Sequence, residues 1–201
     1  EEKSIYDLLV SKESPENIIK ETKIPGMSII PAIVDLAGAE VELVDLEDRE
    51  FILKKTLEKI KDKYNYILID CPPSLGLLTI NALCASDSIL IPLQCEFFAL
   101  EGLTHLLGTL ERVQENLNKN LKLDGIFLTM YDKRNKLTEQ VENDVRDCLG
   151  QKVNKTVIPR NIKLSEAPSH GLPVTLYDSN CIGSLAYMNL AKEFIQRNSE
   201  E

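Results

Sequence analysis

The chain has 201 residues, of which 43% are hydrophobic and 27% are charged, and its formal net charge is −9. This is ordinary composition for a soluble protein of single-domain size, and no hydrophobic run reaches the roughly 20 residues that a bilayer-spanning helix needs. The five cysteines are odd in number and form no Cys-x-x-Cys pair, which argues against a disulfide framework or a zinc knuckle. We therefore expect one domain covering residues 1–201, located in the cytoplasm.

Residues 1–65 are expected to form a first helix, a connecting segment and a second helix. Ser4 is typical of a helix N-cap, and Pro15 is typical of the first turn of a helix. The stretch 27–32 predicts a short strand that is ended by a proline. Hydrophobic residues at helical spacing over 51–64 predict a helix that leads directly into the next segment.

The segment Tyr66–Gly76 (YILIDCPPSLG) carries the pattern around which we interpret the rest of the chain. Its uninterrupted hydrophobic run predicts a strand that is buried on both faces of a parallel sheet. Asp70 follows at the carboxyl end, where α/β proteins bind ligands and where a carboxylate can hold a magnesium-bound water. Pro72 and Pro73 then restrict the path of the loop. The alternative is an aspartate that ends a strand and starts a turn.

Helices and strands alternate in the remainder of the chain. We expect helices at 77–85, 98–117, 137–149 and 183–197, and strands at 88–93, 123–131 and 155–158. This order predicts an α/β fold, a doubly wound and mostly parallel sheet with helices on both faces. His105 is interpreted as structural, because no second metal-type ligand accompanies it at helical spacing.

Basic residues are concentrated in one part of the chain. Residues 133–163 contain eight Lys and Arg but four Asp and Glu, a net charge of +4 that leaves −13 on the remainder. A protein with one basic face and an acidic body can bind a polyanion in one orientation. The alternative is a solvated face of mixed charge, which is the usual explanation of such counts.

Three runs of residues resemble the ParA/Soj family of chromosome- and plasmid-partitioning ATPases, which have a deviant Walker A motif and are related to MinD. The runs are Ile67–Ser74 (ILIDCPPS), Leu128–Asp132 (LTMYD) and above all Val157–Gly171 (VIPRNIKLSEAPSHG). The resemblance extends in order over nearly the whole chain and implies a P-loop NTPase-like fold. It also implies ATP and Mg²⁺ as cofactors, an ATP-dependent homodimer, non-specific DNA binding on the nucleoid, and release when a ParB-type activator stimulates hydrolysis.

The resemblance assigns nucleotide roles to three residues. Asp70 matches the catalytic Walker B aspartate, which holds Mg²⁺ indirectly through water. Pro159 and Asn161 match positions that contact adenine. A proline ring offers a flat apolar surface to a base, and an amide can meet its hydrogen-bonding edge. The alternative for this pair is a proline that ends a strand and an asparagine that forms a turn.

The resemblance also assigns DNA-binding roles to basic residues. Arg134 and Lys163 match the two basic positions that are tied to non-specific DNA binding, and Arg160 lies nearby in the sequence. Lys163 stands where arginine is usual in the family, which keeps the point charge but loses the planar fork of a guanidinium. Binding would involve the phosphate backbone, because no base-reading motif accompanies these residues.

One part of the family pattern is absent, since none of the nine glycines stands in a Gly-x-x-x-x-Gly-Lys-Ser/Thr motif. In the family this loop precedes the point at which the chain begins. We therefore expect an N-terminally truncated part of a longer ATPase, which lacks its first β-P-loop-α unit and does not hydrolyse ATP by itself. Two alternatives stay open: a MinD-like membrane-cycling ATPase, which the acidic end at 196–201 disfavours, and a nucleotide-free interaction fragment.

Overall fold

The computed structural model describes residues 3–72 and 74–199, and it divides into two compact units. The first unit takes in the described part of Glu1–Ser88 together with Thr109–Leu121, and the second takes in Ile89–Gly108 and the described part of Lys122–Glu201. The single-domain expectation stays a prediction. Pro73 of the expected loop and the acidic end at 200–201 lie outside the described residues. No helix of the described part is both long and apolar enough to cross a bilayer.

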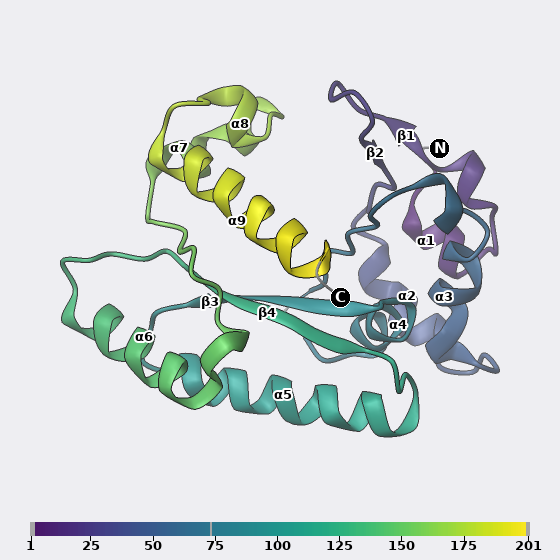
Figure 1. Cartoon of the computed structure of the whole chain (residues 1–201). Helices are drawn as coiled ribbons and strands as arrows, with labels where there is room; N and C mark the ends of the chain where they lie inside the picture. The colour runs from purple at the N-terminus through teal and green to yellow at the C-terminus, as the bar shows by residue number, and fades with distance from the viewer. Residues whose placement is uncertain (1–2, 73, 200–201) are drawn as a thin grey trace. The chain divides into compact units, whose positions relative to one another are not determined.

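Short helices make up most of the regular secondary structure of the first unit (Figure 1). They are α1 (Ile5–Leu9), α2 (Leu36–Leu43), α3 (Ile52–Leu57) and α4 (Leu77–Ala85), with 3₁₀ turns at Pro15–Asn17, Arg49–Phe51 and Lys61–Lys63. A capping box starts α1, because Ser4 Oγ accepts the N–H of Tyr6 at 3.2 Å and the Asp7 carboxylate accepts the N–H of Ser4 at 2.8 Å. Helix α2 lies where only a connecting segment was expected, and the α-helix expected over 51–64 is confined to α3.

A buried amide links two helices in the core of the first unit. The Asn81 side chain on α4 is 0% exposed. Its Oδ1 accepts the N–H of Leu53 at 3.1 Å, and its Nδ2 donates to the carbonyl oxygens of Arg49 at 2.8 Å and Leu77 at 3.0 Å. Leu53 is the second residue of α3, so its N–H has no partner within that helix. Asn81 therefore supplies the missing acceptor from a residue 28 positions away in the sequence.

The segment Tyr66–Asp70 is not a buried strand, which corrects the expectation. Leu68 is 87% exposed, and none of the described strands pairs with this segment. A strand exists only where a neighbour supplies hydrogen-bond partners for its backbone, and hydrophobic composition alone does not provide one. The strand expected over 27–32 is also shorter than predicted, because only β2 (Ser28–Ile29) is regular, paired antiparallel with β1 (Lys20–Glu21).

A parallel sheet with helices on both faces organises the second unit, and the predicted fold class is confirmed (Figure 1). Its strands are β3 (Ser88–Gln94) and β4 (Lys122–Thr129), and its helices are α6 (Lys136–Leu149), α7 (Ile162–Glu166), α8 (Val174–Tyr177), α9 (Ile182–Ser199) and the first part of α5 (Ala99–Asn116). Side chains alternate along β4. Ile126 and Leu128 pack in the core with α5 and α6, whereas Phe127 packs with Leu190 of α9. Both faces of β4 are thus covered.

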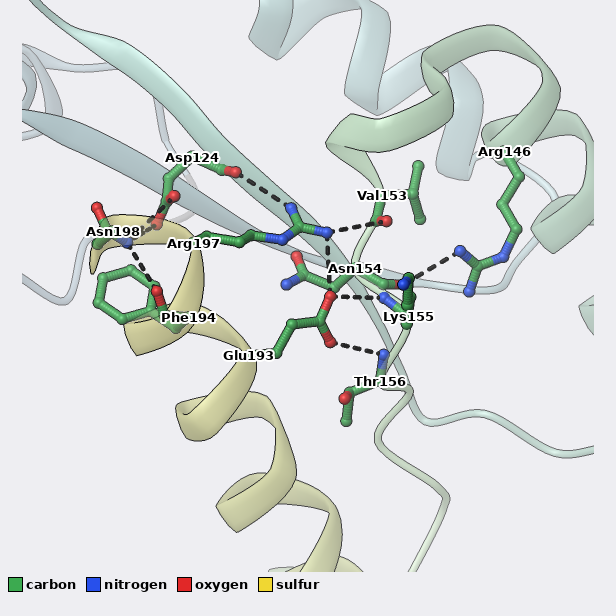
Figure 2. A network of polar contacts seen from close by, with 10 residues as sticks. All are labelled: Asp124, Arg146, Val153, Asn154, Lys155, Thr156, Glu193, Phe194, Arg197 and Asn198. Carbon is green, nitrogen blue, oxygen red and sulfur yellow. Dashed lines mark hydrogen bonds and ion pairs between the residues drawn. The ribbon is translucent and has the colours of Figure 1, made fainter. Parts of the chain in front are cut away.

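The segment 153–159 runs parallel to β4 without forming the regular strand that was expected at 155–158. Isolated parallel bridges join it to β4 and to the residues just after β4, at Ile126↔Val153 and Tyr131↔Pro159. Between these bridges, the N–H groups of Lys155 and Thr156 donate to the Glu193 carboxylate of α9 at 2.8 and 2.9 Å, rather than to a neighbouring strand (Figure 2). This side chain therefore interrupts the regular pairing.

Glu193 belongs to a network of hydrogen bonds and ion pairs that connects α9 to the segment 153–159 (Figure 2). Arg197, one turn later on α9, donates to Glu193 at 3.0 Å and to the carbonyl oxygen of Val153 at 3.4 Å. From α6, Arg146 donates to the carbonyl oxygen of Asn154 at 3.1 Å. Helices on both sides of the sheet thus fix the chain just before Pro159.

Candidate functional site

An open pocket of about 760 Å³ lies in the second unit, beyond the carboxyl end of β4. This volume is within the range of roughly 300–1,000 Å³ that is typical of small-molecule sites. Its lining comes from the residues after β4, from the end of segment 153–160 and from α9: Tyr131, Asp132, Lys133, Arg134, Thr156, Val157, Pro159, Arg160, Ile182, Leu185, Ala186 and Asn189. The predicted residues Arg134, Pro159 and Arg160 therefore share one pocket.

The pocket lining combines hydrophobic side chains with an excess of positive charge. Hydrophobic surface comes from Val157, Pro159, Ile182, Leu185 and Ala186, while three cations (Lys133, Arg134 and Arg160) face one carboxylate, Asp132. Hydrophobic surface suits a flat organic ring, and surplus positive charge attracts anions. The lining is therefore chemically suited to a ligand that has both a ring and a phosphate.

Asp132 orients Arg134 at this pocket. Arg134 donates through Nε to Oδ1 at 2.9 Å and through Nη2 to Oδ2 at 2.8 Å, and its backbone N–H donates to Oδ1 at 3.0 Å. These bonds, together with the positive charge of Arg160, hold the pKa of Asp132 well below its ordinary value. The Arg134 side chain is nevertheless 88% exposed, so it remains accessible to a second anion.

Pro159 and Asn161 differ in their positions. Pro159 is partly buried and lines the pocket, whereas Asn161 does not line it and caps helix α7. The Asn161 Oδ1 accepts the N–H of Lys163 at 2.8 Å, as is usual for an N-cap. Within the described residues its amide nitrogen has no protein partner. That nitrogen can therefore donate to a ligand next to Pro159.

Lys163 belongs to a cluster at α7 and α8, separate from the pocket lining. Its Nζ lies 2.9 Å from Glu166 Oε2 and 5.5 Å from the centre of the Tyr177 ring. The Tyr177 hydroxyl donates to the same Glu166 oxygen at 3.1 Å, and His170 stacks on the Tyr177 ring at 4.8 Å. The bond to Glu166 raises the pKa of Lys163, and the bond from Lys163 lowers the pKa of Glu166.

Asp70 belongs to the first unit, whereas the other five predicted residues belong to the second. Its carboxylate is exposed, and partial desolvation by neighbouring atoms together with the Asp70 charge raises the pKa of the Cys71 thiol. No three His, Cys, Asp or Glu side chains in the described part of the chain gather closely enough to cage a metal ion. Mg²⁺ needs no such cage, because it keeps several waters and uses one or two carboxylates with phosphates. A single exposed carboxylate such as Asp70 fits that role.

Some residues that shape the pocket were not predicted from the sequence. Leu185 of α9 was expected only as a helix residue, Ile182 lay just before the expected helix at 183–197, and hydrophobic positions of this kind carry no signal for a site. Asp132 belonged to the LTMYD run and offered a usable signal as the charged residue after a strand. In the separate cluster at α7 and α8, Tyr177 and Glu166 offered no sequence signal that distinguished them from the other polar residues of that segment.

Comparisons with known proteins find relatives that match nearly the whole chain. A family model described as an AAA domain matches residues 1–123. The protein named chromosome-partitioning ATPase Soj from Treponema pallidum (strain Nichols) is 53% identical over 197 residues, which cover 98% of this chain and 78% of that protein. The Mycobacterium smegmatis structure described as cobyrinic acid a,c-diamide synthase, with a bound ATP analogue and magnesium, is 36% identical with a TM-score of 0.73, over 84% of this chain and 72% of that one. A putative plasmid partition protein from Borrelia burgdorferi B31, bound to AMPPNP, shares the fold with a TM-score of 0.81 at 22% identity, over 96% of this chain and 74% of that one.

Proposed function

Because this chain belongs to the Soj/ParA family of chromosome-partitioning ATPases, we propose that it binds the base of ATP at Pro159 and that Asp70 serves hydrolysis. The observation that carries the proposal is the open pocket beyond β4, which places Pro159 among hydrophobic side chains and cations. ATP offers a flat ring and a polyanion, the two features for which the lining is suited.

The predicted residues of the two units have different roles in the proposed function. Pro159 supplies a flat apolar surface for adenine, and the amide nitrogen of Asn161 donates to the edge of the ring. Asp70 would hold Mg²⁺ indirectly, as an acceptor for one of the waters that this ion keeps. Mg²⁺, when bound, neutralises charge on the phosphates and polarises the phosphoryl group. The anion cradle of a P-loop is not among these residues, so we do not expect phosphate release from this chain unextended.

The same proposal includes the partition cycle of the family. ATP joins two copies of the chain, the dimer binds DNA through Arg134, Arg160 and Lys163, and a ParB-type activator stimulates hydrolysis and release. The exposure of Arg134 and Arg160 supports this role, as does the net positive charge of 133–163. Contacts of this kind neutralise backbone phosphates and do not read bases.

The test uses an extended protein, in which a β-P-loop-α unit with a Gly-x-x-x-x-Gly-Lys-Thr motif precedes this chain. Phosphate release that depends on Mg²⁺ and ATP is expected from the extended protein and not from the unextended chain. Asp70→Ala should reduce turnover by about 10²–10³, in line with the loss of one positioned charged group. Asp87→Ala removes another exposed carboxylate of the first unit and serves as the matched control.

Three results would contradict the proposal. One is turnover unchanged by Asp70→Ala with an unchanged circular dichroism spectrum, which would make Asp70 a turn residue. Another is phosphate release by the unextended chain that Asp70→Ala abolishes. The third is an extended protein that is folded but does not bind a fluorescent ATP analogue, which would favour the nucleotide-free interaction fragment.

A further inference from the structure

One oxygen of Glu166 is the meeting point of two donors. Glu166 Oε2 accepts from Lys163 Nζ at 2.9 Å and from the Tyr177 hydroxyl at 3.1 Å. The ammonium group also lies 5.5 Å from the centre of the Tyr177 ring. A cation and a hydroxyl that converge on one anionic oxygen provide what a phosphate oxygen requires. The carboxylate thus occupies a place that is chemically suited to a phosphate.

The Tyr177 ring is held in place by packing, whereas the Glu166 carboxylate can move away from Lys163 and Tyr177. His170 stacks on Tyr177 with an interplanar angle of 26°, which supports the ring from one side. The Lys163 side chain is 42% exposed and that of Glu166 is 40% exposed, so solvent and ligands reach both. Exposed lysine–carboxylate pairs contribute little to folding, and Glu166 can therefore exchange for another anion at little cost to the fold.

We infer that Lys163 and Tyr177 form a binding site for a phosphate of the DNA backbone, and that Glu166 is the internal competitor for this site. The inference rests on the proposed DNA binding and adds two residues to it. Tyr177 becomes a phosphate contact, and Glu166 sets how tightly the site binds. Removal of the Glu166 charge should strengthen DNA binding, while removal of the Tyr177 hydroxyl should weaken it.

Arg160 provides an internal comparison. Within the described residues its guanidinium forms no ion pair, whereas Lys163 is paired. A phosphate that approaches Arg160 displaces no protein carboxylate, but one that approaches Lys163 must displace Glu166. Removal of Glu166 should therefore act through Lys163 and not through the other cations of the basic stretch.

The experiment measures the affinity of the extended protein, with ATP, for two unrelated DNA duplexes by fluorescence anisotropy. Glu166→Gln keeps the size of the side chain and removes its charge, and it should tighten binding by about threefold to fivefold for both duplexes. Glu139→Gln removes one exposed charge elsewhere in the basic stretch and should change affinity by less than about twofold. Tyr177→Phe should weaken binding by about twofold to fivefold.

A double-mutant cycle separates a specific competitor from general charge repulsion. In a Lys163→Gln background, Glu166→Gln should lose its tightening effect. A thermal melt and the affinity for a fluorescent ATP analogue should stay at wild-type values for Tyr177→Phe. If Tyr177→Phe weakens ATP binding and leaves DNA binding unchanged, the phosphate belongs to the nucleotide and the inference is overturned.

The remaining outcomes are also decisive. One outcome is that the wild-type protein binds DNA, Lys163→Gln weakens this binding, and Glu166→Gln changes it no more than Glu139→Gln does. In that case the proposed function stands and the competitor inference fails. If Glu166→Gln tightens binding equally with and without Lys163, the effect is general electrostatics and the inference again fails. If wild-type protein binds neither duplex, the proposed DNA binding fails and the inference fails with it.

Discussion

Arg134 and Asp132 form a two-point ion pair, with Nε 2.9 Å from Oδ1 and Nη2 2.8 Å from Oδ2. Parallel bonds of this kind are among the strongest that a guanidinium makes. They fix the direction of a side chain that is otherwise 88% exposed. The pair therefore presents a cation at the pocket, and its effects can be measured by titration and by ligand binding.

The first prediction concerns the titration of Asp132. Arg134 and Arg160 hold its pKa well below the ordinary 3.8, so the carboxyl should remain ionised when an ordinary aspartate is already protonated. A lowered pKa in the folded state means that the pair stabilises the fold above the ordinary pKa. This stabilisation is lost as the pH falls through the lowered value.

Carbon-detected NMR of the carboxyl groups checks this prediction. Arg134→Gln should raise the pKa of Asp132 towards its ordinary value. Glu13 is the control, because Asn17 and Lys3 lower its pKa to about 2 independently of Arg134. An Asp132 carboxyl that titrates at its ordinary value in the wild-type protein would show that the ion pair does not persist in solution.

The second prediction concerns the buried amide of Asn81. Asn81→Leu keeps a similar volume but leaves the N–H of Leu53 without its acceptor and removes the amide that donates to the carbonyl oxygens of Arg49 and Leu77. We expect the free energy of unfolding to fall by about 2–4 kcal/mol, because each buried unpaired group costs about 1–3 kcal/mol. Asn116→Ala is the control, since Asn116 is exposed and should change stability by less than about 0.5 kcal/mol. Equal urea midpoints for the two variants, followed by circular dichroism, would contradict a structural role of the amide.

Local sequence patterns predicted the longer helices and the strands β3 and β4, whereas they missed the short helices α2, α7 and α8 and predicted a strand at Tyr66–Asp70 that does not form. Helix α4 lies at the expected residues 77–85, because its hydrophobic run begins directly after Gly76 and needs only its own backbone for hydrogen bonds. The run at Tyr66–Asp70 has the composition of a buried strand, but a strand depends on a neighbour that composition does not reveal. Glu193 could not be foreseen either, because its two N–H partners lie 38 and 37 residues away.

In the candidate site, too, some residues were found from the sequence and others only from the packing of distant segments. The quoted runs led to Pro159, Arg160 and Arg134, which the structure brings into one pocket. The pairing of Lys163 with Glu166 was not predicted, because the sequence patterns indicated no helix at 162–166 that would bring residues three apart together. The second donor to that carboxylate, Tyr177, lies 11 residues beyond Glu166, and only the packing of α8 against α7 brings it there.

The third prediction concerns the attachment of α9. Glu193→Ala removes an acceptor that receives the N–H groups of Lys155 and Thr156 and an ion pair with Arg197. Amide hydrogen exchange at Lys155 and Thr156 should become faster by about 10-fold to 100-fold, since bonds to a charged acceptor contribute about 1.5–3 kcal/mol. Lys192→Ala changes an exposed neighbour on the same helix and should leave this exchange as in wild type. Exchange that is equally slow in both variants would show that Glu193 does not protect these groups.

The last prediction compares an unpaired with a paired cation in DNA binding. Arg160 forms no ion pair within the described residues, whereas Arg134 is already held by Asp132. A phosphate contact releases counterions only where the cation is not neutralised by the protein. Arg160→Ala should therefore reduce the dependence of log affinity on log salt by about 0.9 for each lost contact, and Arg134→Ala should reduce it by less. Because an ATP-dependent dimer contains two copies of each residue, one substitution removes up to two contacts and the change in slope can double.

The measurement follows the affinity of the extended protein for two unrelated duplexes over a salt series, with dimerisation monitored separately by light scattering. Lys192→Ala serves as the control, because this exposed cation lies outside the basic stretch 133–163. Equal reductions of the slope for Arg160→Ala and Arg134→Ala would show that Asp132 releases Arg134 on binding. Wild-type slopes for both would make the basic stretch a solvated face. A loss of affinity for only one duplex would mean that these side chains read bases, which contradicts binding through the phosphate backbone.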